Sequence, residues 1–261
     1  MSEISKNTTE KFAEAYQQNN KQNALQRGVV KNGITASAET IQGHVNNVPV
    51  FSVDVTTGKV SNQKQSGRCW MFAALNTFRH KMLNAFNLKD FELSQNHTFF
   101  WDKYEKANYF YENVLATAQE PLSSRKVAFL LQTPQQDGGQ WDMIVSIFQK
   151  YGVVPKAVMP ESSNSSNSRD LNNYLNKKLR KDAGTLRQLV ADGQSEAAIQ
   201  EAKEGMLQEI YNFLATSLGT PPETFDFEYR DEEKNYHIDR GLTPQTFYDK
   251  YVGVDLDDYV S

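Results

Sequence analysis

The chain has 261 residues, 39% of them hydrophobic and 23% charged, which is typical of a globular protein with a buried core and excludes wholesale disorder. Its formal net charge of −4 gives no general attraction to nucleic acid or to an anionic membrane, so neither partner is predicted. One cysteine, no membrane-length apolar stretch and a polar first segment exclude an internal disulfide, a cysteine-rich zinc site and a secretory signal, and we therefore expect a cytoplasmic protein without a metal or cofactor.

The first 60 residues are predicted to form an arm followed by an extended segment. Apolar side chains recur among polar ones over residues 8–25, which is the pattern of a short amphipathic helix. Residues 48–60 alternate weakly between apolar and polar side chains and are expected to be extended up to a turn at Thr57-Gly58. We expect the helix over residues 8–25 to be either an arm or a cover for a surface of the protein.

Helices dominate the next part of the chain. Apolar residues recur three or four apart over residues 69–86, which predicts a helix that begins at Cys69. Ser94 is expected to cap a second helix, rich in aromatic residues, that runs to Tyr111. A turn at Asp137-Gly138-Gly139 then opens a third helix, over residues 140–151, which ends before a glycine.

The remaining residues are predicted to form two long helices, a hairpin and a short helix. The long helices cover residues 169–190 and 195–218, and the hairpin joins two alternating segments over residues 225–238. The short helix is capped by Thr243-Pro244 and runs to Tyr251. Residues 252–260 have a strand-like apolar content, and because stable domains seldom stop within such an element, we expect that the natural protein continues.

Cys69 stands at a position where a thiol can be activated. The first turn of a helix offers unsatisfied N–H groups and a positive dipole end, which stabilise a thiolate. Gln63 lies on the preceding polar loop, and its amide could donate to an oxyanion that also meets the Cys69 N–H. Gly67 allows close approach of the backbone. A lone cysteine can also be buried and inert, but the combination favours a nucleophile.

The segment around Cys69 resembles a known nucleophile segment. Residues 63–74, Gln-Lys-Gln-Ser-Gly-Arg-Cys-Trp-Met-Phe-Ala-Ala, are similar to the corresponding segment of papain-like cysteine peptidases. Residues 62–76, 99–104, 132–141 and 151–156 resemble the bleomycin hydrolase and bacterial aminopeptidase C branch of that superfamily. The resemblance implies an α+β papain-like fold, of which this chain covers mainly the helical half and a helical insertion, with most of the barrel-like half missing.

Domain boundaries are expected from the same resemblance. They separate an arm with its extended segment, a nucleophile-bearing helical domain, a helical insertion with the hairpin, and the start of a second half. The corresponding residues are 1–60, 61–165, 166–242 and 243–261.

The resemblance also assigns roles to individual residues. It implies that Cys69 is the nucleophile, that Gln63 donates to the oxyanion, and that Gly138-Gly139 and Trp70 contact the substrate. Read alone, the two glycines are a tight turn before a helix. Secreted relatives usually carry a disulfide cysteine three residues before the nucleophile, and Ser66 in its place agrees with an intracellular enzyme.

The histidine that a cysteine peptidase needs is not evident in the chain. The papain pattern places it roughly 130–150 residues after the cysteine, and residues 199–219 contain none. His237 is the only serious candidate, but its setting is charged, whereas the family's histidine opens an apolar strand. His44, His80 and His97 are expected to be structural. We therefore expect the catalytic His and Asn outside this chain, which alone would be inactive.

The implied activity is that of a thiol aminopeptidase. The full-length enzyme would remove N-terminal residues from peptides with a free N-terminus through an acyl-enzyme on Cys69, and would assemble as a homo-hexamer. A catalytically silent assembly or interaction module is one alternative. An acyl transferase with a Cys-His-Asp triad is another, because it uses the same nucleophile geometry.

Overall fold

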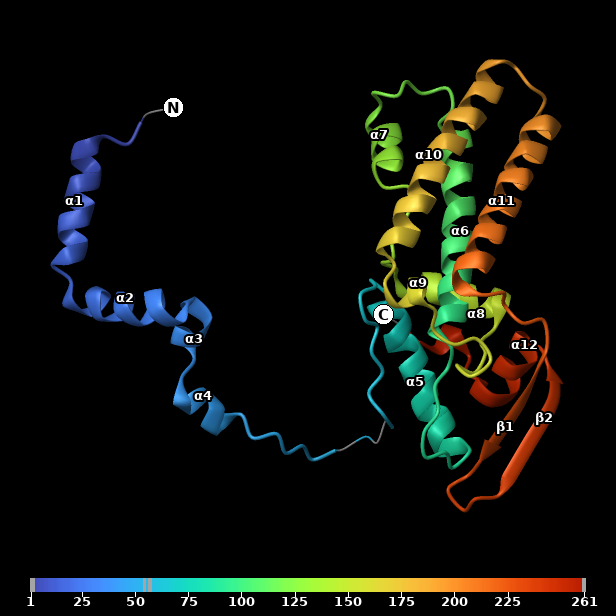
Figure 1. Cartoon of the computed structure of the whole chain (residues 1–261), viewed down its shortest axis with the longest axis horizontal. Coiled ribbons are helices and arrows are strands. Elements are labelled where there is room, and N and C mark those ends of the chain that lie inside the picture. Colours follow the sequence, from blue (N-terminus) through green and yellow to red (C-terminus); the bar gives the residue numbers. More distant parts are fainter. Residues whose placement is uncertain (1–2, 54, 56–57, 260–261) are drawn as a thin grey trace. The chain divides into compact units, whose positions relative to one another are not determined.

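The computed structural model describes residues 3–53, 55 and 58–259 and divides the chain into two compact units, Met1–Val55 and Thr56–Ser261. None of the side chains described in the first unit is buried. The residues described there form four short helices, coloured blue in Figure 1, which are α1 (Lys6–Gln17), α2 (Asn20–Asn32), α3 (Ile34–Ala38) and α4 (Ile41–Asn46). The domain boundaries expected from the sequence stay predictions.

The single helix expected over residues 8–25 is divided in two. Asn19 begins α2, because its side-chain oxygen accepts two backbone N–H groups from the first turn of that helix. Asparagine is a strong N-cap but a poor interior residue, which explains the break. Residues 48–53 lie outside helices and strands, as expected, whereas Thr57 of the predicted turn lies outside the described residues.

The second unit is a bundle of helices with a two-stranded hairpin at one end (Figure 1). Helix α6 contacts α5, α8, α10 and α11 and so forms the centre of the bundle. No helix among the described residues is both long and apolar enough to span a bilayer. The elements are α5 (Cys69–Ala85), α6 (Gln95–Ala116), α7 (Arg125–Gln132), α8 (Trp141–Tyr151), α9 (Ser163–Ser166), α10 (Arg169–Ala191), α11 (Glu196–Leu218), β1 (Phe225–Arg230), β2 (Tyr236–Leu242), α12 (Pro244–Phe247), the π-helical turn η1 (Tyr248–Val252) and the 3₁₀ turn η2 (Leu256–Asp258).

The helix predicted to begin at Cys69 is confirmed as α5. Its inner face is apolar and buried, at the three- and four-residue spacing that predicted it, through Met71, Leu75, Phe78 and Met82. The cap predicted at Ser94 is also confirmed, since its hydroxyl oxygen accepts the N–H of His97 at 3.0 Å. Helix α6 extends beyond the expected end at Tyr111, and α8 ends at Gly152 as predicted.

Two further helices, α10 and α11, pack against α6 as the predicted amphipathic pair. Leu171, Leu175 and Leu179 are buried on the inner face of α10, and Ser195 caps α11. Helix α7 was not predicted from the sequence. Its eight residues contain five consecutive apolar side chains, of which only Val127 is buried, and a short unbroken apolar run has no period that separates a helix from a strand.

The predicted hairpin is confirmed, but the strand-like end is not. Strands β1 and β2 pair antiparallel, and Phe227 packs edge-on against Phe247 at 5.1 Å between ring centroids. The strand-like prediction for residues 252–260 is wrong for the residues that the structure describes, 252–259, which end the turn η1, form the turn η2 and contain no strand. Gly253 has φ +52, a left-handed conformation that interrupts extension, and Leu256 is buried within η2. Val252, Val254 and Leu256 are therefore buried as parts of turns and not of a strand.

Candidate active site

Cys69 is the first residue of α5, and its side chain is exposed. No side chain among the described residues caps this helix. The N–H groups of its first turn therefore remain available to an anion, and the helix dipole favours negative charge beside them. The position suits both a thiolate and the oxyanion of an acyl-transfer reaction, in contrast to a cysteine sealed in the core.

Gln63 folds back into its own loop, defined here as the nucleophile loop, residues 61–68. Its Nε2 donates to the carbonyl of Ser66 at 2.8 Å, and the Ser66 hydroxyl donates to the carbonyl of Gln63 at 2.7 Å. The primary amide has a second N–H, which is the donor that the oxyanion role requires. That role stays a prediction. The reciprocal bonds fix the loop just before the helix that carries Cys69.

Arg68, next to Cys69, is fully buried. Its guanidinium makes two bonds to the Glu161 carboxylate, at 3.0 and 2.7 Å, and its Nε donates to the Ser66 hydroxyl at 2.8 Å. It also lies over the rings of Phe72 and Phe99, at 5.2 and 5.1 Å from their centroids. A buried guanidinium is stable only when paired in this way. This anchor was missed in the sequence, where Arg68 reads as a loop residue.

The nucleophile loop is also joined to the segment before α10. Gln65 forms a parallel β-bridge with Asn167. The Gln65 N–H donates to the carbonyl of Ser166 at 2.9 Å, and the N–H of Ser168 donates to the Gln65 carbonyl at 3.3 Å. Segments about a hundred residues apart in the chain are thus hydrogen-bonded beside Cys69.

Asp137 connects the nucleophile loop to the glycine turn, residues 136–139. Its carboxylate accepts the N–H of Gly67 at 3.0 Å, the ammonium of Lys103 at 2.8 Å and the amide of Asn172 at 2.7 Å, together with the hydroxyl of Ser168. Burial alone would raise the pKa of Asp137, but the Lys103 ammonium and the Gly67 N–H outweigh it and hold that pKa well below its usual range. Asp137 therefore remains a carboxylate.

Trp70 lies against the glycine turn. Its indole Nε1 donates to the Asp137 carbonyl at 2.8 Å, and a Cβ placed on Gly139 would stand 2.5 Å from the indole ring. A Cβ on Gly138 would meet nothing within 4 Å. Trp70, Gly139 and Trp141 line a hollow of about 280 Å³. Of the residues expected to contact substrate, Trp70, which directly follows Cys69 in the chain, therefore packs against the turn that contains Gly138-Gly139.

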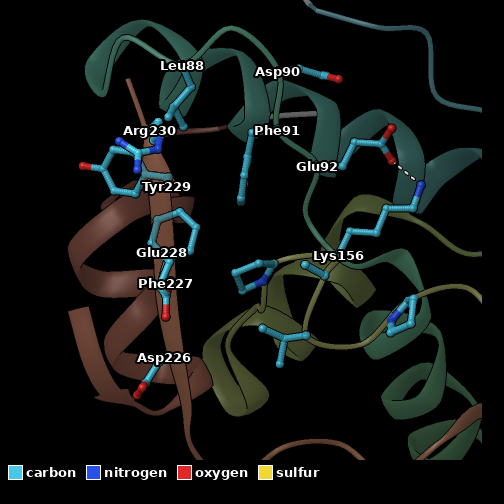
Figure 2. Close-up of a pocket in the computed structure, with 14 residues that line it drawn as sticks. Leu88, Asp90, Phe91, Glu92, Lys156, Asp226, Phe227, Glu228, Tyr229 and Arg230 are labelled. Atoms are coloured by element: carbon cyan, nitrogen blue, oxygen red, sulfur yellow. Dashed lines mark hydrogen bonds and ion pairs between the residues drawn. The ribbon is translucent and has the colours of Figure 1, made fainter. Parts of the chain in front are cut away.

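Another cavity, of about 840 Å³, lies elsewhere in the second unit (Figure 2). It runs along β1 and is closed on the other side by residues 88–92 and 155–160. Lys156 and Glu92 form an ion pair at 2.5 Å at its rim. It holds none of the residues predicted for catalysis, so cavity size does not identify the site.

Two histidines lie on the helices next to the site but serve other contacts. His97 is buried on α6, where its Nε2 accepts the indole N–H of Trp101 at 3.2 Å, and burial lowers its pKa to about 3. His80 lies on α5, roughly 16 Å along the helix from Cys69 at 1.5 Å per residue, and bonds to Asn84 at 3.1 Å. Both positions fit the structural roles expected.

The other two histidines are exposed. His237 lies on β2, with its Nε2 at 3.0 Å from the Asp231 carboxylate and its ring stacked on Tyr229. His44 belongs to the first unit, where it pairs with Glu39 at 3.7 Å. The contacts described for the four imidazoles go to Asn84, Trp101, Asp231 and Glu39. No group of three or more acidic, histidine or cysteine side chains among the described residues is arranged to hold a metal ion.

Comparison with known proteins decides the family. A model of the Peptidase C1-like family matches residues 3–261. The chain belongs to the Peptidase C1-like family. Its resemblance to the bleomycin hydrolase and aminopeptidase C branch is confirmed, and its mostly helical fold with a small two-stranded sheet is consistent with a papain-like peptidase of this family.

Members of the family with high identity are longer than this chain. Aminopeptidase C of Streptococcus thermophilus is 60% identical over 261 residues, which are 100% of this chain and 59% of that protein. Aminopeptidase W of Lactobacillus delbrueckii subsp. lactis is 45% identical over 99% of this chain and 59% of its own length. The crystal structure of PepW from Lactobacillus rhamnosis HN001 matches with a TM-score of 0.95 and 63% identity, over 98% of this chain and 58% of that one. The chain thus spans less than two thirds of these relatives, whose names support a peptidase function.

Proposed function

We propose that the chain provides the nucleophile of a cysteine aminopeptidase that removes N-terminal residues from peptides. The observation that carries the proposal is the exposed Cys69 thiol at the uncapped start of α5, beside a glycine turn that Asp137 fixes in place. The names of the relatives, Aminopeptidase C and Aminopeptidase W, support the same reaction class.

The proposed reaction begins with attack of the Cys69 thiolate on the carbonyl carbon of the first peptide bond. The oxyanion that forms accepts hydrogen bonds from the backbone N–H of Cys69 and from the second side-chain N–H of Gln63. An imidazole protonates the leaving amine, the C–N bond breaks, and a thioester remains on Cys69. Water hydrolyses the thioester and releases the N-terminal amino acid. The substrate backbone lies along Gly138-Gly139, with a side chain directed to the hollow beside Trp70.

We infer that the imidazole and its orienting asparagine come from outside these 261 residues. Each of the four histidines has another partner or place, as described above, and the relatives have additional length. This chain alone should therefore bind peptide weakly and turn none over. The cytoplasmic location and the homo-hexamer remain proposals that rest on the resemblance.

The test uses the full-length protein and an aminoacyl arylamide as substrate. Cys69→Ala should lower turnover by about a thousandfold or more, because the reaction loses its nucleophile. Ser146→Ala is a matched control, since this exposed hydroxyl only bonds to the Asp142 carbonyl of its own helix, and should retain turnover within about twofold. Retained turnover in Cys69→Ala would contradict the proposal.

The same preparation separates the two alternatives. A silent assembly module would give no Cys69-dependent product at full length. An acyl transferase would give a product in which the acyl group resides on an added amine, whereas a hydrolase gives the free amino acid. Mass spectrometry of the products with and without an added amine distinguishes these outcomes.

A further inference from the structure

Lys106 on α6 holds the glycine turn, although the reaction proposed above does not use it. Its ammonium donates to the carbonyls of Gln136 at 2.9 Å and Gly138 at 2.8 Å. The third donor goes to the carboxylate of Asp102, at 2.8 Å. All three protons of the ammonium are therefore committed, two of them to the backbone of the turn.

Two other side chains, those of Trp70 and Lys103, hold Asp137 of the turn by hydrogen bonds. The Asp137 carbonyl accepts the Trp70 indole N–H, and the Asp137 carboxylate accepts the ammonium of Lys103. The three consecutive carbonyls of residues 136–138 thus each have a donor from a side chain. The Lys106 ammonium also lies 5.4 Å from the centroid of the Trp70 ring, which is a cation–π distance. One ammonium therefore contacts both the glycine turn and Trp70.

The Lys106 side chain and its carboxylate partner are largely shielded from water, whereas the carbonyls that it binds lie at the surface. The side chain of Lys106 is 13% exposed, and that of its partner Asp102 is 1% exposed. Hydrogen bonds to charged groups shielded from water are stronger than those on the surface. Because the peptide planes of the turn are fixed by these bonds, the groups that the turn presents to a substrate backbone are fixed with them.

We propose that Lys106 is a positioning residue of the aminopeptidase, which sets the glycine turn to receive the substrate backbone. The proposal rests on the function proposed above. It assigns to Lys106 a role in substrate binding and none in bond making, because its ammonium contacts the carbonyls of the turn and the Trp70 ring, and none of its described hydrogen bonds goes to Cys69 or Gln63.

The test compares Lys106→Met with Lys150→Met in the full-length protein. Lys150 is a matched control, since it also pairs with an acidic residue of α6, Glu105, but is 62% exposed and does not contact the turn. We expect Lys106→Met to raise KM about tenfold while kcat stays within about twofold. Lys150→Met should leave both constants unchanged.

A second variant guards against a trivial loss of folding. Lys106→Met leaves the buried Asp102 without its cation, which destabilises the protein on its own account. Lys106→Met combined with Asp102→Asn removes both charges and should recover the melting temperature. The higher KM should persist in this double variant, because the two backbone carbonyls still lack their donor.

The outcomes separate this inference from the proposed function. A KM that returns to normal in the double variant, or that changes equally in Lys150→Met, overturns the positioning role. A fall in kcat without a change in KM overturns it as well. Failure of Cys69→Ala to abolish turnover contradicts the proposed function itself, whatever the Lys106 variants show.

Discussion

The site around Cys69 and the β1–β2 hairpin both contain charged pairs, but those of the site are much less exposed to water, Glu161 being the more exposed partner of Arg68 at 21%. The Arg68 side chain is 0% exposed in its pair with Glu161, whereas Arg240 and Asp226 of the hairpin are 73% and 43% exposed. Removing one partner of a buried pair lowers the free energy of unfolding by about 3–5 kcal/mol, whereas an exposed pair contributes only about 0–1 kcal/mol. The difference teaches that exposed charge in this chain is tolerant of change and that buried charge fixes the geometry where chemistry is proposed.

The largest effect should come from breaking the buried pair. Arg68→Met leaves the Glu161 carboxylate without its cation and the Ser66 hydroxyl oxygen without the guanidinium N–H, and should lower the free energy of unfolding by about 3 kcal/mol. Arg240→Met, in the hairpin, should lower it by no more than about 0.5 kcal/mol. Urea titration measures both. Equal losses would remove the contrast between the two regions.

A smaller effect is expected from a single methyl group on the glycine turn. Gly139→Ala places a Cβ 2.5 Å from the Trp70 ring and should cost about 2 kcal/mol, because the indole must move and lose its bond to the Asp137 carbonyl. Gly138→Ala is the matched control, since it meets nothing within 4 Å. Urea titration gives the cost, and tryptophan fluorescence reports the indole. A larger change in Gly138→Ala would contradict the packing described.

The buried His97 makes the free energy of unfolding depend on pH. His97 is buried with its pKa lowered from 6.5 to about 3, so the unfolded chain binds a proton that the folded chain refuses. Its contribution to stability is full above pH 6.5 and is lost as pH falls toward 3, by about 1.4 kcal/mol per pH unit. His97→Gln keeps an acceptor for Trp101 but no titrating group, and should remove this slope. Urea titrations from pH 7 to 5 measure it, and an unchanged slope would contradict it.

The smallest effect is expected for the histidine of the hairpin. His237→Gln should leave turnover of the full-length protein within about twofold and the melting temperature within about 2 °C, because the pair with Asp231 is on the surface. A loss of turnover comparable with that of Cys69→Ala would show that His237 is the catalytic base, and would overturn the proposal that the base lies outside these residues.

Much of the fold could be predicted because the apolar spacing and the capping residues of its helices are local features of the sequence. The spacing of apolar residues indicated α5, α10 and α11, and Ser94 marked the start of α6. The short helix predicted after Thr243-Pro244 is present as α12 and the π-helical turn η1. Helix α7 was not predicted, because a short unbroken run of apolar residues has no period that separates a helix from a strand. The turn η2 was expected to be extended, because apolar residues alternate around it.

The site was predicted in part for the same reason. Cys69 at the start of a helix is a local pattern, and the structure places it there. The pair of Arg68 with Glu161 spans 93 residues and that of Lys103 with Asp137 spans 34, so no local motif connects them. Lys106 likewise reads as an ordinary lysine of an aromatic helix. Buried charge is read from tertiary structure, where its partners become visible.

The carboxylate of Asp137 has a consequence for how the enzyme can be handled. It ties the loop of Cys69 to the glycine turn by charge and hydrogen bonds, and not by a disulfide. Because Cys69 is the one cysteine of these 261 residues, a thiol reductant keeps it reduced and breaks no disulfide within them. Dithiothreitol should therefore protect the nucleophile without loosening the architecture around it.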